Sequence, residues 1–329
     1  MTVLRLTNLC NDDWSLGKLG RDAEALRTLL QQTGLDGYEW MRWGDGGLDA
    51  LPREKLIGRH LHFWPMWLDF WRGDRGALLR QFGTEAAWQT YYGAADQEAF
   101  VQNLRSELLD AEAWGARYAV FHVSHVELEH CYTSDYTYTD DEIVDAAAEL
   151  LNAATDGLAL TLALLMENHW YPGLTLRVSD AAQRLLGGVR YANKGFVLDV
   201  GHLMNTNPNL REEQQAVDYI HATLDALDCA NAIRAMHLNC SFSGEYALAS
   251  RGAPPWATAA PFEERLTACF GHVGKLDRHE PFLHPAIASV VRRVNPEYLV
   301  YELSTPSREE LVQKVRAQNL ALAASWLGR

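Results

Sequence analysis

The strongest constraint on the fold of this chain is an end-to-end alternation of short apolar runs with amphipathic stretches of helical period. Apolar runs of this length are typical of buried strands, and stretches that open with caps such as Thr139-Asp140-Asp141-Glu142 are typical of helices. Strands and helices that alternate without a break in composition predict one α/β domain, a (β/α)8 TIM barrel over residues 1–329. The predicted strands are Val3–Leu9, Gly37–Trp43, Ile57–Trp64, Tyr118–Val123, Leu160–Met166, Gly195–Val200, Ile233–Leu238 and Tyr298–Leu303.

Two long segments interrupt the alternation, one after the third predicted strand and one after the seventh. The first, residues 64–92, is rich in aromatic side chains, and the second, residues 239–281, contains a Pro254-Pro255 pair that a continuous helix cannot accommodate. Both follow strands, so we expect them at the carboxyl-end face, where barrel enzymes build their active sites. We expect the aromatic side chains of the first segment to pack over the barrel mouth, to contact a substrate, or to do both.

Composition excludes several classes of protein. The formal charge of −14 argues against a broad nucleic-acid-binding surface. The five cysteines form no C-x-x-C pair, which argues against a disulfide framework and a thiolate zinc site. The opening residues lack the pattern of a signal peptide, and no apolar run reaches the roughly 18 residues of a membrane span. We therefore expect a cytoplasmic enzyme without a membrane anchor.

Metal-ligand side chains lie at the ends of the last four predicted strands. A carboxylate or imidazole at the end of a buried strand is costly unless it is paired or coordinated, and successive strand ends of a barrel surround one axis. Carboxylates combined with imidazole suit a divalent ion such as manganese, magnesium, cobalt or zinc. The predicted ligands are Glu167, Asp199, His237 and Glu302, with His202 close by.

These motifs resemble the xylose-isomerase-like barrel superfamily, which includes sugar isomerases, sugar epimerases and the endonuclease IV group. The resemblance rests on ENH at Glu167, DVGH at Asp199, the strand-embedded His237 and VYEL at Glu302. In the epimerase branch, the matching residues bind one metal ion, and the two glutamates move a proton through a metal-stabilised enediolate. This implies that Glu167 and Glu302 are catalytic, and that His202 hydrogen-bonds a substrate hydroxyl.

The resemblance to endonuclease IV implies additional ligands. Asp277 and His279 match its D-x-H pair, and His62 and His122 match two further histidine ligands. Together with His202 these residues could raise the number of bound ions from one to three. His60 competes with His62 for its role, and His125 competes with His122.

We favour a metal-dependent isomerase or epimerase of a sugar or related hydroxy-ketone, with one bound ion. The alternatives are an endonuclease IV-like zinc phosphodiesterase and a multinuclear iron-dependent oxidase that acts on a peptide or small molecule. The expected partner is a carbohydrate-like small molecule rather than nucleic acid, with His202, Trp64 and Trp170 as binding residues. Barrels of this kind often form homo-oligomers, which we also expect here.

Overall fold

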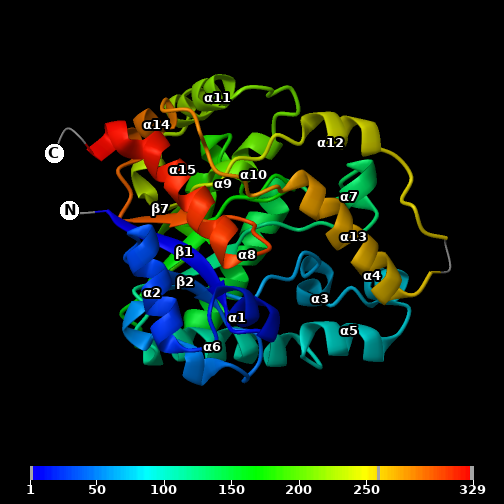
Figure 1. Ribbon diagram of the computed structural model, residues 1–329. Helices are drawn as coiled ribbons and strands as arrows, with labels where there is room; N and C mark the ends of the chain where they lie inside the picture. Colours follow the sequence, from blue (N-terminus) through cyan, green and yellow to red (C-terminus); the bar gives the residue numbers. More distant parts are fainter. Residues whose placement is uncertain (1–2, 258–259, 327–329) are drawn as a thin grey trace.

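Eight parallel strands close into a barrel in sequence order in the computed structural model, which describes residues 3–257 and 260–326 (Figure 1). The predicted (β/α)8 barrel is thereby confirmed. The strands are β1 (Leu4–Cys10), β2 (Gly37–Met41), β3 (Leu56–His60), β4 (Tyr118–His122), β5 (Ala163–Glu167), β6 (Lys194–Asp199), β7 (Ile233–His237) and β8 (Tyr298–Tyr301).

Helices surround the barrel and fill the two long segments. The capping box predicted at Thr139 is present, and it begins the helix from Asp140 to Thr155. The helices are α1 (Asp13–Leu19), α2 (Ala23–Thr33), α3 (Leu68–Arg72), α4 (Arg75–Phe82), α5 (Glu85–Tyr92), α6 (Gln97–Ala113), α7 (His130–Thr133), α8 (Asp140–Thr155), α9 (Ser179–Gly188), α10 (Val200–Asn205), α11 (Glu213–Ala226), α12 (Gly244–Ser250), α13 (Phe262–Leu276), α14 (Ile287–Val294) and α15 (Arg308–Trp326).

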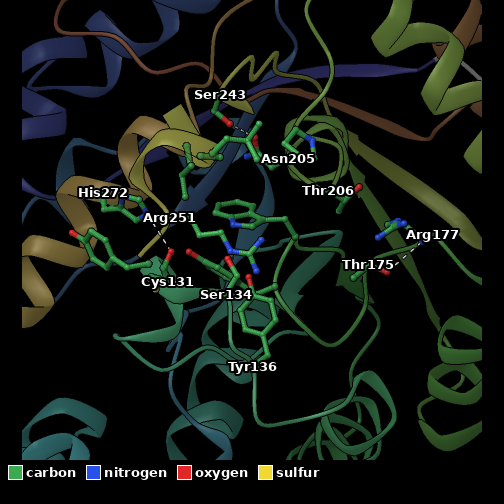
Figure 2. A pocket seen from close by; sticks show the side chains of 17 residues that line it. Cys131, Ser134, Tyr136, Thr175, Arg177, Asn205, Thr206, Ser243, Arg251 and His272 are labelled. Carbon is green, nitrogen blue, oxygen red and sulfur yellow. Dashed lines mark hydrogen bonds between the residues drawn. The ribbon is translucent and has the colours of Figure 1, made fainter. Parts of the chain in front are cut away.

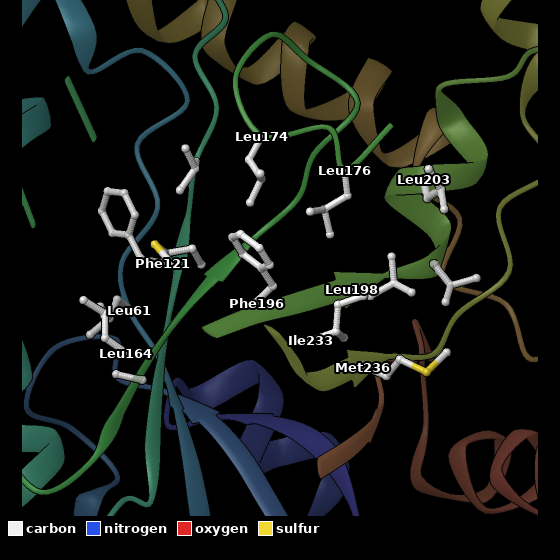
Figure 3. Packing of buried hydrophobic residues seen from close by; sticks show 14 of the residues in the cluster. Leu61, Phe121, Leu164, Leu174, Leu176, Phe196, Leu198, Leu203, Ile233 and Met236 are labelled. Carbon is white, nitrogen blue, oxygen red and sulfur yellow. The ribbon is translucent and has the colours of Figure 1, made fainter. Parts of the chain in front are cut away.

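Alternate residues of each strand face opposite sides of the barrel wall. Leu164 and Met166 of β5 pack outward against the helices, whereas Leu165 between them belongs to the cluster inside the barrel. Figure 3 shows the outward layer, in which Leu164, Phe196 and Leu198 lie between the strands and the surrounding chain. This alternation fixes which side chain at each strand end points towards the barrel axis.

The two long segments lie side by side at the carboxyl-end face. Helices α3, α4 and α5 follow β3, and α12 and α13 follow β7. Figure 1 shows α4 beside α13, where the rings of Phe82 and Phe262 lie 4.4 Å apart. Most aromatic side chains of the first segment are buried, and pairs such as Phe70 and Tyr92, 4.2 Å apart, pack against each other. This segment is therefore largely a small core over the barrel rather than a set of exposed rings.

The third strand differs from its prediction. It ends at His60, four residues before the predicted end at Trp64, because the chain turns away to enter the aromatic segment. Across the described part of the chain, no helix combines the length and apolarity that crossing a membrane requires.

Candidate metal centre

Each strand from β3 to β7 ends on a residue that can bind a metal ion. Four of these residues occupy inward-facing positions of their strands. In β5, for example, Ala163 and Leu165 face inward, and Glu167 takes the next inward-facing position. Neighbouring ends are also in register, with His122 opposite Glu167 and Asp199 opposite His237. The strand-end residues are His60, His122, Glu167, Asp199 and His237, and Glu302 directly follows β8.

Glu167 lies at the middle of the centre and contacts two histidines through one oxygen. Its Oε2 lies 2.9 Å from Nε2 of His122 and 3.4 Å from Nε2 of His60, and the two nitrogen atoms are 3.1 Å apart. Donors around a tetrahedral zinc ion lie roughly 3.3 Å from one another, from Zn–N distances of about 2.0–2.1 Å. These three side chains therefore have the spacing of ligands to a common ion.

The other oxygen of Glu167 belongs to a second group of four ligands. Glu167 Oε1 lies 3.2 Å from Nδ1 of His237, which is also 3.2 Å from Oε2 of Glu302. Asp199 Oδ2 lies 3.8 Å from the same nitrogen. Glu167 thus connects the two groups through its two oxygens.

A third group combines His202 with the D-x-H pair. Asp277 Oδ2 lies 2.5 Å from Nε2 of His279 and 3.4 Å from Nε2 of His202. His202 Nδ1 is in turn 3.4 Å from Glu167 Oε1, so this group adjoins the first two. His279 has a φ of 51°, a left-handed conformation that is uncommon outside glycine and often marks functional sites.

The rings of four histidines are each oriented by a partner that is either a backbone carbonyl or a carboxylate outside the three ligand groups. Nδ1 lies within hydrogen-bonding distance of a backbone carbonyl in three of them: Leu61 for His60, Asn168 for His202 and Glu302 for His279. In His237 it is Nε2 that faces the carboxylate of Glu39, 3.2 Å away. With a metal ion bound, each ring would donate from the nitrogen that faces this partner and present the lone pair of the other nitrogen to the ion.

Buried polar atoms at the centre lack hydrogen-bond partners. Among the described residues, this holds for both oxygens of Glu167, for Nδ1 of His237 and for Oε2 of Glu302. Each carboxylate lies beside a histidine at ion-pair distance but without hydrogen-bond geometry, and a cation between these atoms would satisfy their lone pairs. The donor set of carboxylates and imidazoles fits divalent metal ions such as zinc, manganese or iron.

The electrostatics lead to the same conclusion. Burial opposes charge on His202, but Asp199 and Asp277 outweigh this effect and raise its pKa to about 10. Burial alone would raise the pKa of Glu167, yet His122 and His237 hold that pKa well below its ordinary value. The carboxylates thus attract positive charge to the histidines, and a metal ion would displace these protons when it binds.

Asparagines at neighbouring strand ends hold Asp199 in place. Asn168 exchanges hydrogen bonds with the backbone of Asp199, and Asn239 Nδ2 donates to Asp199 Oδ2 at 2.9 Å. Gly201 of the DVGH motif leaves room for this contact, because a Cβ there would lie 1.7 Å from Asn239 Oδ1. The motif therefore combines a ligand, a glycine required by close packing and a second ligand, His202.

Not every predicted residue lies at the centre. His62 lies between the rings of Trp43 and Trp64, at 5.3 and 4.3 Å, and His60 lies where His62 was expected. The early end of β3 is the reason. Trp64 is buried and donates through Nε1 to the carbonyl of Tyr91, so it belongs to the core of the aromatic segment. Trp170 lies beside the centre, with its ring 5.1 Å from that of His202.

A pocket of about 290 Å³ opens onto the centre from the side of β1, β2 and α1. Glu302, His60, His122 and Glu39 line its inner end. Its outer part is largely apolar and aromatic, with Lys18 as a positive charge near the mouth; these residues include Leu9, Trp14, Met41, Phe63, Leu303 and Leu311. The sequence did not indicate Trp14 or Lys18, since neither belongs to a motif or a strand end.

The family model of xylose isomerase-like TIM barrels matches residues 28–317. This chain belongs to that family. The family resemblance of the sequence motifs is thereby confirmed. The sequence matches none of the curated proteins with which it was compared.

The fold is similar to several solved structures of low sequence identity. One is the zinc-bound IOLI protein, which has 12% identity and a TM-score of 0.54, with 98% of this chain and 99% of that one covered. Another is an L-ribulose 3-epimerase, which has 12% identity and a TM-score of 0.53, with 97% of this chain and 95% of that one covered. Endonuclease IV from Thermus thermophilus has 16% identity and a TM-score of 0.48, with 98% of this chain and 99% of that one covered. At such identities the similarity shows the fold alone. Many members of this family are enzymes, and the reaction of this chain has to be inferred from its site.

Proposed function

We propose that this chain is a metal-dependent enzyme whose centre holds two or three divalent ions, and that it hydrolyses a phosphoester in a small molecule. One observation carries the proposal: Glu167 belongs to two ligand groups, and a third group adjoins it through His202. An enzyme with one ion needs the four ligands around His237 alone. The additional ligands, including His60 and Asp277, then need a role of their own.

The surroundings of Glu167 support a bridging role. Only 1% of its side chain is exposed, and histidines from four directions contact its two oxygens. A carboxylate enclosed in this way suits a bridge between ions and has no open side towards a substrate. This favours a multinuclear centre over a mechanism in which Glu167 moves a proton as a free base.

Charge balance supports an anionic substrate. Four carboxylates contribute to the three ligand groups. One divalent ion would leave the centre negative and repel an anion, whereas three ions bring six positive charges and leave it positive. Two ions would balance the four carboxylates, and a centre with three ions would attract a phosphoester.

The pocket at Glu302 supplies a place for the substrate. Its apolar and aromatic wall suits the body of a small molecule, and its inner end brings the reacting group to His60, His122 and Glu302. Bound divalent ions would stabilise charge on a phosphoryl group and lower the pKa of a water molecule. Glu302 lines the pocket and is placed to accept a proton from that water or from the substrate.

An isomerase or epimerase is the second candidate. The observation that favours it is that Glu167, Asp199, His237 and Glu302 form a complete ligand set for one ion, with Glu302 at the pocket. Its two-carboxylate mechanism also needs Glu167 as a base, which the burial of Glu167 disfavours. An iron-dependent oxidase would use the same ligands as the hydrolase and differs in its metal and in its need for oxygen.

Metal content is the deciding experiment. The protein is purified anaerobically, stripped, reloaded separately with zinc, manganese and iron(II), and analysed for metal per chain. We expect two or three ions, and release of phosphate from a panel of small phosphomonoesters and phosphodiesters. One ion per chain together with turnover of ketoses would overturn the proposal in favour of the isomerase. Iron-dependent oxygen consumption without phosphate release would overturn it in favour of the oxidase.

A small-molecule substrate fits the pocket better than nucleic acid does. The chain carries a formal charge of −14, and the centre is reached through a pocket of about 290 Å³. A cytoplasmic location and assembly into a homo-oligomer remain part of the proposal. Fractionation and size-exclusion chromatography with light scattering test these two points.

A further inference from the structure

A second pocket, of about 230 Å³, shares no lining residue with the first (Figure 2). It is formed by α7, the loops that follow β5 and α10, and the helices α12 and α13. Arg251 extends into the middle of the view in Figure 2, near Ser134 and Tyr136, and Arg177 lies towards one side. No role has yet been given to this pocket.

The pocket is positively charged in an acidic protein. Its lining contains Arg177 and Arg251 and, among the residues that the structure describes, no aspartate or glutamate. Neither arginine forms an ion pair within residues 3–257 and 260–326. Both arginines are exposed to solvent, and their position in one pocket without a carboxylate, in a chain with a charge of −14, favours a ligand that carries the opposite charge.

Hydrogen-bond donors in the pocket are also unused. Nδ2 of Asn205 and Nε1 of Trp170 are buried and have no acceptor in the described part of the chain. Ser243 donates to Oδ1 of Asn205 at 2.8 Å, which fixes the amide and leaves Nδ2 as its free group. Arg251 donates from Nε to the carbonyl of Thr133 at 3.2 Å, which holds its guanidinium group in the pocket. An anionic oxygen would satisfy such donors.

The pocket adjoins the metal centre through Trp170. The indole ring lines the pocket and lies 5.1 Å from the ring of His202. Leu276, another lining residue, directly precedes Asp277 of the third ligand group. A molecule that reacts at the centre could therefore extend past Trp170 into this pocket.

We propose that this second pocket binds an anionic group, a phosphate or a carboxylate, at the far end of the substrate. The donors that recognise it are the guanidinium groups of Arg177 and Arg251, Nδ2 of Asn205 and Nε1 of Trp170. The anion site rests on the proposed function, because the anion is placed on the molecule that reacts at the centre. The substrate is then elongated, with its reacting group and its second anionic group on either side of Trp170.

Anion titration of the full chain tests this site. Inorganic phosphate and acetate are titrated calorimetrically into the metal-loaded protein, and again after chelation with the fold checked by circular dichroism. An anion site that persists after chelation is independent of metal. We expect Arg251→Met and Arg177→Met each to weaken that site roughly tenfold, the loss expected for a charged hydrogen bond. The matched control is Arg21→Met, an exposed arginine that lines neither pocket.

The outcomes identify the anion, and they distinguish failure of the anion site from failure of the metal centre. Weaker binding of phosphate alone assigns a phosphate, and weaker binding of acetate alone assigns a carboxylate. If neither anion binds, or if the control variant loses as much affinity as the pocket variants, the anion site is wrong. Metal content is measured on the same samples, so failure of the metal centre is recognised separately from failure of the anion site.

Discussion

The carboxylate of Glu39 on β2 lies 3.2 Å from Nε2 of His237 on β7, although 198 positions separate them in the sequence. The contact crosses the inside of the barrel, since β1 and β8 lie between these strands. Tyr118 donates its hydroxyl to Glu39 at 2.7 Å and thereby fixes the carboxylate. Three strands thus combine to direct Nδ1 of His237 towards Glu167 and Glu302.

The first prediction concerns Glu39. In Glu39→Gln, His237 loses its charged partner, so its ring is held less firmly and is less basic. We expect the affinity for metal to fall roughly 10- to 100-fold, as when the outer partner of a metal-binding histidine is removed. Competition with a chromophoric chelator measures this change. Tyr118→Phe keeps the carboxylate and should have a smaller effect; an equal effect would contradict the role given to Glu39.

The second prediction separates two neighbouring histidines. His60→Ala should lower the metal content by about one ion per chain, because His60 contacts Glu167 and His122. His62→Ala serves as the matched control and should leave the metal content unchanged, because His62 packs between Trp43 and Trp64. Elemental analysis of both variants gives the answer. A loss of metal from the His62 variant alone would reverse this assignment.

The third prediction concerns packing beneath the centre. A Cβ at Gly58 would lie 2.2 Å from Cζ of Tyr118, whose fully buried ring has no free direction in which to move. Gly58→Ala should therefore destabilise the protein by about 1–3 kcal/mol, the range for overpacked cores. It should also weaken metal binding, since Tyr118 holds Glu39.

Gly187→Ala is the control for that substitution. Gly187 lies in helix α9, and a Cβ there would meet no atom within 4 Å. This variant should be neutral or more stable by up to about 1 kcal/mol, because alanine favours helix. Urea denaturation compares the two variants. Equal stability of both would show that Tyr118 can move aside.

The fourth prediction concerns the pH dependence of stability. Nδ1 of His125 accepts hydrogen bonds from the backbone N–H groups of Trp67 and Leu68, and burial lowers the pKa of this ring to about 3. In the unfolded chain that pKa returns to about 6.5. Between these values the unfolded state binds a proton that the folded state does not. Acidification therefore lowers the free energy of unfolding, by up to about 1.4 kcal/mol per pH unit.

His125→Asn tests this effect. Asparagine places Oδ1 at the position of Nδ1, can accept the same backbone hydrogen bonds and does not titrate. Between pH values of about 6.5 and 5, the variant should lose less stability than the unmodified protein does in urea denaturation. Parallel losses in both proteins would show that His125 does not contribute to the pH dependence.

Much of the fold could be predicted from the sequence, because the apolar runs and the amphipathic stretches that determine it are both local features. The alternation of apolar runs with amphipathic stretches specifies strands and helices in turn, and a regular series of such units closes into a barrel. The family motifs then indicated Glu167, Asp199, His237 and Glu302, since each follows an apolar run. The distances between these side chains could not be predicted, because they depend on the register of strands far apart in the chain.

The choice between His60 and His62 shows where local reasoning fails. Both histidines have the same parity on an extended strand, so the pattern of alternation cannot separate them. Only the end of β3 at His60 excludes His62, and that end depends on how the aromatic segment packs over the barrel. The role of Glu39 was missed for a related reason, since its partner lies on a distant strand.

The sequence by itself determined the strand order, the alternation of inward and outward residues and the identity of most candidate ligands. Tertiary structure decided which ligands share Glu167, which nitrogen of each histidine faces the centre and which loops bring the two arginines to the second pocket. The physical reason is that periodicity and residue type act within one strand or helix. Ligand geometry, burial and the electric field at the centre arise only when the ends of all strands surround a common axis.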